Sequence, residues 1–297
     1  MTKIHRGISY TESYFLKEYI DLNTSQRANA KNDLEKDFFK LMNNACFGKT
    51  MESVRNRKDI TLATTVNQLR KLVNSNNYRS HKIFGEDLVM VERQKADVYL
   101  NKPIFIGQAI LDLSKIHMYD FHYNYMLKKY PGKAQLLYTD TDSLVYHIET
   151  EDHYDDMKHD AHLYDLSNFP KDHPLYDETN KKVIGKFKDE EAGKVISEFI
   201  ALRAKLYSYI TDKDEEVKKC KGVKKQVVKN EVTFEDYKSV LLSKIPIEKR
   251  MNVFRSRNHQ LYTEQVSKVA LDSNDDKRTI LPDGISTLAL GHYSLCS

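Results

Sequence analysis

The feature that most constrains the fold of this chain is an acidic, polar string between two short apolar segments. Residues 135–138 and 144–148 have the composition of strands, and Thr139-Asp140-Thr141-Asp142-Ser143 lies between them. Two short strands that flank a turn-prone polar cluster predict a β-hairpin. Helical patterns alternate with such short strands along the rest of the chain, which favours an α+β fold with an antiparallel sheet.

The two aspartates of this string form a candidate metal site. Asp140 and Asp142 are two residues apart, so in an extended backbone we expect both carboxylates to project to the same side. Two adjacent carboxylates repel each other unless a cation lies between them, and Mg²⁺ (or Mn²⁺) prefers oxygen ligands. A pair of such ions can align an attacking hydroxyl with a leaving pyrophosphate. The alternative is a turn that uses Asp because Asp suits turns. The flanking strands favour the metal site.

Two helices are expected near the N-terminus. Thr11 is expected to cap a first helix through Ile20, which ends at the polar residues 23–25. A second helix is expected from about Asn32 to Phe47, with Gly48 as its C-terminal cap. Its apolar stripe is expected to consist of Leu34, Phe38, Leu41, Met42 and Ala45. The short polar link between these helices predicts an antiparallel helical hairpin.

The second helix also carries a candidate nucleotide site. Lys40, Asn44 and Phe47 fall at i, i+4 and i+7 on one face, with Lys36 one turn earlier. Lysines on such a face can neutralise a triphosphate, Asn44 can hydrogen-bond, and Phe47 can pack on a base or sugar. The alternative is an amphipathic helix with solvated lysines.

The remaining elements are expected from local patterns. Strands are expected at 60–65, 88–92, 98–100, 184–187 and 207–211, and helices at 104–127, 190–202 and 234–243. The acidic residues 149–180 are expected to be loop-rich. The histidines of residues 147–173 lack a tight ligand spacing, which favours a solvated insertion over a metal site.

Charge distribution and cysteine content limit the classes of function that this chain could have. Residues 151–180 contain nine acidic and two basic side chains, whereas residues 181–257 contain 20 basic and 12 acidic ones. This asymmetry suggests a polyanion partner, although a charged solvated face is equally common. Cys46, Cys220 and Cys296 form no Cys-x-x-Cys pair, which argues against disulfides and structural zinc. There is no apolar run of about 18 residues and no signal peptide, so we expect an intracellular protein without a membrane partner.

Several motifs resemble those of family B DNA polymerases. Tyr138-Thr139-Asp140-Thr141-Asp142-Ser143 resembles the palm motif YxDTDS, and residues 40–48 resemble the fingers motif KxxxNSxYG, with Ala45 and Phe47 replacing Ser and Tyr. Lys205-Leu206-Tyr207 resembles the KxY motif. Longer stretches, such as residues 19–57 and 252–278, are similar to polymerases of Maverick/Polinton-type transposons, within the protein-primed, viral and organellar branch.

This resemblance implies a right-hand polymerase and assigns roles to residues. Fingers would span residues 1–58, palm 59–228 and thumb 229–297. Asp142 and Asp140 would hold Mg²⁺ or Mn²⁺, and the incoming dNTP would be bound by residues of the second helix, namely Lys36, Lys40, Asn44, Phe47 and Gly48. The DNA primer-template would be bound by Lys205 and Tyr207 and by the basic segment residues Lys221, Lys224 and Lys225, which would contact phosphate without sequence readout. A terminal protein could act as primer, and a nuclear location would suit a transposon-derived enzyme.

The family pattern also contains parts that this sequence lacks. A further catalytic Asp, in a DxxSLYP-like motif, should precede the fingers, but the only Asp before Asp33 is Asp21, in a helical context. We therefore expect a C-terminal portion that lacks the exonuclease and is nearly inactive alone. A catalytically dead, transposon-derived nucleic-acid-binding fragment is the alternative. A reverse transcriptase palm is disfavoured, because it normally has paired Asp-Asp.

Overall fold

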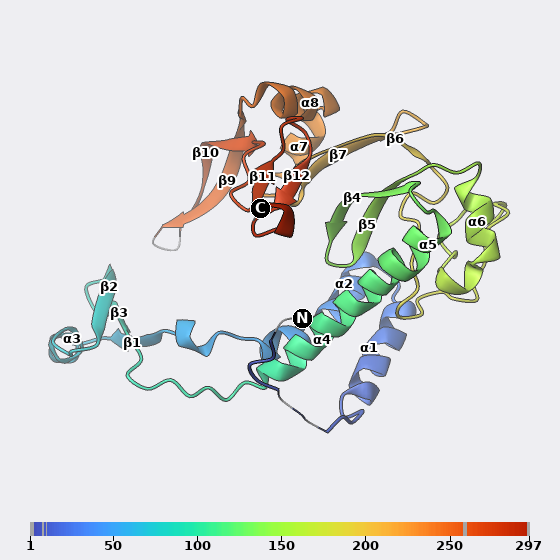
Figure 1. Ribbon diagram of the computed structural model, residues 1–297. Helices are drawn as coiled ribbons and strands as arrows, with labels where there is room; N and C mark the ends of the chain where they lie inside the picture. The colour runs from blue at the N-terminus through green and yellow to red at the C-terminus, as the bar shows by residue number, and fades with distance from the viewer. Residues whose placement is uncertain (1–2, 8, 10, 258–259, 296–297) are drawn as a thin grey trace. The chain divides into compact units, whose positions relative to one another are not determined.

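The computed structural model describes residues 3–7, 9, 11–257 and 260–295, and the chain forms two compact units, residues 1–115 and 116–297 (Figure 1). Both units combine helices with small antiparallel sheets, which confirms the α+β class. The right-hand layout and the domain boundaries at residues 58 and 228 stay predictions. Cys296 lies outside the described residues. Among the described helices, none is long and apolar enough to cross a membrane.

The first unit begins with two contacting helices, α1 (Lys17–Ala28) and α2 (Asp33–Thr50). Asn32 caps α2, because its side-chain oxygen accepts the Glu35 N–H at 2.9 Å. The predicted cap of the first helix at Thr11 is wrong, because α1 begins at Lys17 with Leu16 at its N-cap position. Its predicted end is also wrong, because the Thr24 hydroxyl bonds back to the Ile20 carbonyl at 2.7 Å and the helix continues to Ala28.

The second helix also differs from prediction at its end and on its apolar face. Gly48 lies inside α2 rather than capping it, because the helix continues to Thr50. The predicted stripe is largely exposed, with Leu34 at 80%, Phe38 at 52% and Leu41 at 61%. The contact with α1 involves another face, where the Asn43 amide donates to the Thr24 hydroxyl at 3.4 Å.

A small sheet follows the short 3-10 helix η1 (Val54–Asn56). Its strands β1 (Asp59–Ala63), β2 (Tyr78–Gly85) and β3 (Leu88–Arg93) pair antiparallel in the order β1-β3-β2. Helix α3 (Val66–Val73) contacts β1 and β3, and Val89 and Val91 are buried. The strands predicted near 60–65 and 88–92 are confirmed, whereas 98–100 forms no strand.

A long helical segment leads out of the first unit. It comprises α4 (Ile104–Tyr119), the π-helical η2 (Asp120–Met126) and α5 (Leu127–Lys129), which confirms the helix predicted at 104–127. Near its start the backbone lies close to Met51, since a Cβ on Gly107 would lie 2.2 Å from Met51 Cγ. Only glycine fits at this position without displacing Met51.

The second unit contains the predicted hairpin and a three-stranded sheet. Strands β4 (Ala134–Asp140) and β5 (Ser143–Ile148) pair antiparallel with Asp140 opposite Ser143, which confirms the hairpin. The sheet has the order β6-β7-β8 and is formed by β6 (Ile196–Arg203), β7 (Leu206–Thr211) and β8 (Glu216–Cys220). The predicted helix at 190–202 is wrong because residues 196–203 pair with β7. The predicted strand at 184–187 is also wrong, with a single bridge from Phe187 to Tyr164.

The acidic residues 149–180 are loop-rich, as predicted, but they are not a solvated insertion. They contain α6 (His153–His159) and η3 (Ala161–Leu163). The Lys129 ammonium pairs with Asp160 and, at 3.7 Å, with Asp156. An apolar cluster joins this segment to the preceding helix; its buried members are Phe121, Met126, Tyr130, Met157, Tyr164, Leu166, Phe169 and Leu175.

The three-stranded sheet and the elements after it share a second apolar cluster, the C-terminal cluster. Its buried members are Leu202, Leu206, Cys220, Val228, Val232, Tyr237, Val240, Ala270 and Leu271. Helices α7 (Lys225–Glu231) and α8 (Phe234–Ser243) contact the ribbon of β9 (Ile247–Arg257) and β10 (Gln260–Leu271). A reciprocal capping box between Thr233 and Asp236 starts α8, which confirms the helix predicted at 234–243. The short strands β11 (Arg278–Ile280) and β12 (Thr287–Ala289) and the 3-10 helix η4 (Tyr293–Leu295) complete the described chain.

Candidate functional site

The carboxylate hairpin, residues 134–148, has a tight and strained turn. Thr141 has a φ of 60°, and the Asp142 N–H donates to the Asp140 carbonyl at 2.7 Å. A positive φ is uncommon for a β-branched residue and often marks a functional site. Asp140 is the last residue of β4 and Asp142 lies in the turn. The backbone between them is therefore not extended, and the geometry from which we expected both carboxylates to project to the same side does not apply.

A second strained turn contacts this hairpin. Ala204 and Lys205 connect β6 to β7, with Lys205 at a φ of 61°. The Lys205 ammonium lies 2.6 Å from Asp140 Oδ2, and the Lys205 N–H donates to the Tyr138 hydroxyl at 2.7 Å. The Tyr138 and Tyr207 rings lie 4.7 Å apart. The fold thus brings the predicted residue Lys205 to the predicted carboxylate Asp140, across 65 residues of sequence, and places Tyr207 against Tyr138.

The electrostatics of this contact follow from the ion pair. The hydrogen bond from Lys205 lowers the pKa of Asp140, and the same bond raises the pKa of Lys205. Burial raises the pKa of Tyr207. The side chains of Lys205 and Asp140 are 48% and 30% exposed, so water screens the pair and it contributes little to stability. The main consequence of the pair is therefore a positive charge positioned beside Asp140, rather than a gain in folding stability.

The basic segment, residues 221–225, adjoins the same turn. The Lys221 N–H donates to the Lys205 carbonyl at 3.2 Å. Gly222 has a φ of 93°, and a Cβ there would lie 2.9 Å from the Lys268 ammonium, which itself donates to the Gly222 carbonyl at 3.0 Å. Lys224 lies over the Phe254 ring at 5.2 Å, and Lys225 begins α7. This segment therefore links the Lys205 turn to the β9–β10 ribbon.

The candidate nucleotide residues lie in the first unit, on α2. Lys36, Lys40 and Asn44 are exposed, and Phe47 is half-buried. Lys36 forms a 3.1 Å ion pair with Asp33 within its own helix. Gly48, expected to cap the helix, lies inside it and is exposed. These residues form a row along one helix, and this row follows from helix geometry alone.

The side chains expected to bind metal at the hairpin have the ligand atoms that a divalent cation prefers. Asp140 and Asp142 offer carboxylate oxygens, which Mg²⁺ prefers. Asp140 Oδ2 is engaged by Lys205, and Asp142 is exposed. Within the described parts of the chain, no three or more His, Cys, Asp or Glu side chains gather as a metal site.

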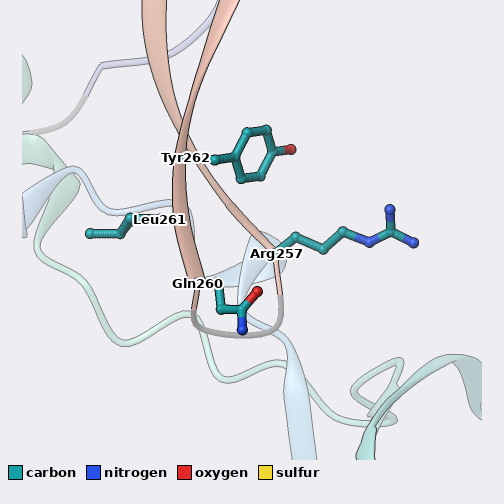
Figure 2. Close-up of a pocket in the computed structure, with 4 residues that line it drawn as sticks. All are labelled: Arg257, Gln260, Leu261 and Tyr262. Atoms are coloured by element: carbon teal, nitrogen blue, oxygen red, sulfur yellow. The ribbon is translucent and has the colours of Figure 1, made fainter.

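An open pocket of about 390 Å³ lies at the distal end of the β9–β10 ribbon (Figure 2). It is lined by Arg257, Gln260, Leu261 and Tyr262. Figure 2 shows the side chains of Arg257 and Tyr262 on one side of the ribbon and Leu261 on the other. Leu261 and the nearby Phe254 are both 79% exposed. The ribbon thus presents basic and apolar groups to solvent.

Residues 1–126 match the family model described as DNA polymerase type B, organellar and viral. The match supports a family B DNA polymerase. It includes the candidate nucleotide residues of α2 and ends before the carboxylate hairpin. No curated protein and no solved structure matches the chain. Polymerases of this family are nucleotidyltransferases that generally use divalent metals, and their partners are a DNA template-primer and dNTPs.

Sequence reasoning missed two residues of this region. Tyr138 belongs to the string that identified the hairpin, yet its contact with the Lys205 backbone depends on how two distant hairpins meet. Lys268 lies in a strand without any distinctive pattern. The only signal for Lys268 is its positive charge, which it shares with many other lysines of this chain.

Proposed function

We propose that this chain carries the nucleotide site, the carboxylate hairpin and the primer contacts of a template-directed DNA polymerase of the protein-primed, viral and organellar type. The observation that carries the proposal is the 2.6 Å contact between Lys205 and Asp140. Two motifs that resemble polymerase motifs, and that lie far apart in sequence, meet in space. The family match over residues 1–126 supports the same function independently, because it ends before both motifs.

Each residue has a proposed role in nucleotidyl transfer. Asp142 is the principal ligand of Mg²⁺ or Mn²⁺ and Asp140 the supporting one. When bound, the ions supply the positive charge that aligns a primer hydroxyl with the leaving pyrophosphate. Lys36 and Lys40 neutralise the triphosphate, while Asn44, Phe47 and Gly48 contact the rest of the nucleotide. In an active enzyme, Lys40→Ala is expected mainly to raise the Michaelis constant for dNTP.

The DNA contacts are proposed for the second unit. Lys205 contacts phosphate and Tyr207 the primer end, close to the metal-binding hairpin. Lys221, Lys224 and Lys225 continue this basic surface along the DNA backbone. The C-terminal region, including the β9–β10 ribbon with its exposed Phe254 and Arg257, acts as the thumb.

We further propose that residues 1–297 alone support little or no synthesis. The resemblance implies another metal-binding Asp in a DxxSLYP-like motif, and the sequence contains no such motif. The same proposal includes a likeness to Maverick/Polinton-type polymerases and a terminal protein as primer. It also includes an intracellular, nuclear place of action.

The test separates metal binding, DNA binding and synthesis. We expect Mn²⁺ binding, followed by electron paramagnetic resonance, to weaken at least about ten-fold in Asp142→Asn, because one carboxylate ligand is lost. Asp214→Asn, in the exposed turn before β8, is the matched control and should bind as the wild type does. Unchanged Mn²⁺ binding in Asp142→Asn would reject the metal assignment. Robust Mg²⁺-dependent primer extension by the 297-residue chain, abolished by Asp142→Asn, would reject the proposed inactivity.

The alternative is a transposon-derived, nucleic-acid-binding protein without catalysis. Both functions predict binding to a primer-template that weakens steeply with salt, because phosphate contacts release counterions. Salt-dependent DNA binding without Mn²⁺ binding supports the alternative. Absence of both kinds of binding rejects both functions.

A further inference from the structure

The Tyr138 hydroxyl, on strand β4 of the carboxylate hairpin, contacts the strained Lys205 turn. It accepts a hydrogen bond of 2.7 Å from the backbone N–H of Lys205. This N–H lies in a two-residue connection between β6 and β7, and Lys205 there has a φ of 61°. A non-glycine residue persists in that conformation only where its surroundings hold it. The Tyr138 hydroxyl is one such constraint, and it comes from the neighbouring hairpin rather than from the turn itself.

The ring of Tyr138 adds a second constraint. It packs against Tyr207 with ring centroids 4.7 Å apart and against Phe199 at 6.3 Å. Phe199 and Tyr207 lie on the two strands joined by the Lys205 turn. Tyr138 therefore contacts both strands of this hairpin and the turn between them. Aromatic contacts of this kind contribute beyond simple burial.

Tyr138 and Asp140 also lie on the same face of β4, since residues two apart in a strand project to one side. Both are half-buried, whereas Leu137 and Thr139 are exposed. Asp140 receives the Lys205 ammonium while Tyr138 receives the Lys205 N–H. Lys205 is thus held through both its main chain and its side chain by two residues on the same face of β4.

We propose that Tyr138 is a positioning residue that fixes the Lys205 turn against the carboxylate hairpin. It thereby sets where the Lys205 ammonium stands relative to Asp140. This inference deepens the proposed function and rests on it for the consequence at the primer end. The contact itself can be tested without any activity.

The first measurement is amide hydrogen exchange at Lys205 in the 297-residue protein, followed by NMR with ¹⁵N-lysine. We expect a protected Lys205 amide in the wild type and at least about ten-fold faster exchange in Tyr138→Phe, which removes one oxygen atom. Tyr146→Phe is the matched control, because Tyr146 lies on β5 of the same hairpin and its hydroxyl contacts His122 Nδ1 at 2.9 Å. An unprotected Lys205 amide in the wild type, or equal exchange in wild type and Tyr138→Phe, overturns the proposal.

The second measurement is a double-mutant cycle on primer-template affinity. We expect Tyr138→Phe to weaken binding about two- to ten-fold, as expected for one hydrogen bond, with no further loss when Lys205→Met is also present. Fully additive losses overturn the positioning role, because Tyr138 would then act independently of Lys205. If the wild type binds no DNA, the proposed function fails, and the exchange measurement still decides whether Tyr138 holds the turn.

Discussion

Helix α2 and the carboxylate hairpin show two ways of building a candidate site. On α2, Lys36, Lys40 and Asn44 share a face because of helical periodicity, and all three are exposed. At the hairpin, Asp140, Lys205 and Tyr138 come from two β-hairpins and are joined by hydrogen bonds of 2.6 and 2.7 Å. The first arrangement is local, so the helix alone preserves it. The second requires the second unit to be folded.

The largest expected difference between the two regions concerns packing. Leu271 is fully buried in the C-terminal cluster, whereas Leu34 on α2 is 80% exposed. We expect Leu271→Ala to lower the free energy of unfolding by about 2–5 kcal/mol, through lost burial and a cavity. Leu34→Ala should change it by less than about 0.5 kcal/mol. Urea denaturation followed by circular dichroism measures both. Similar losses in the two variants would show that α2 buries its apolar stripe in solution.

The second largest expected effect on the free energy of unfolding comes from the carboxylate of Asp165, in the second unit. Burial alone would raise the pKa of Asp165, but hydrogen bonds from Ser167, Lys182 and Lys188 lower it to about 2. A lowered pKa stabilises the folded state above the unfolded pKa of 3.8, and this stability is lost as pH falls toward 2. We expect Asp165→Asn to cost about 2 kcal/mol near neutral pH.

The pH profile of this variant provides the check. The difference in unfolding free energy between wild type and Asp165→Asn should shrink between pH 4 and pH 2. Asp172→Asn is a suitable control, because Asp172 lies in an exposed turn of the same segment. A difference that stays constant through this range would contradict the assigned pKa.

The hairpin contact itself should affect DNA more than stability. We expect Lys205→Met to weaken primer-template binding about three- to thirty-fold and to reduce the salt slope by about one, because one phosphate contact is lost. Lys213→Met, in the exposed turn before β8, serves as control. Fluorescence anisotropy at several salt concentrations measures both variants. An equal salt slope in Lys205→Met and wild type would place DNA away from this turn.

The smallest expected effect concerns the strained turn. Thr141 has a φ of 60°, where glycine pays no steric cost. We expect Thr141→Gly to raise the free energy of unfolding by up to about 1 kcal/mol, reduced by the greater freedom of glycine in the unfolded chain. Thermal unfolding measures the change. A clear loss of stability would mean that the Thr141 hydroxyl, which donates to Asp140 Oδ1 at 3.2 Å, outweighs the strain.

The sequence by itself determined the parts that depend on near neighbours. The carboxylate hairpin, helix α8 and the row of candidate nucleotide residues on α2 all follow from periodicity and turn chemistry. Local pattern failed at residues 190–202, where a helix was predicted, because pairing of residues 196–203 with β7 overrides local preference.

Only the tertiary structure decided what lies beside Asp140. The turn at Ala204 and Lys205 contains no glycine or asparagine from which it could be predicted. Lys205 adopts a positive φ there under constraint from Tyr138. Likewise, the acidic residues 149–180 resemble a solvated loop in composition, yet Lys129 and buried aromatic residues hold them in a core. In both cases the stabilising partner is distant in sequence, so no local pattern could have shown it.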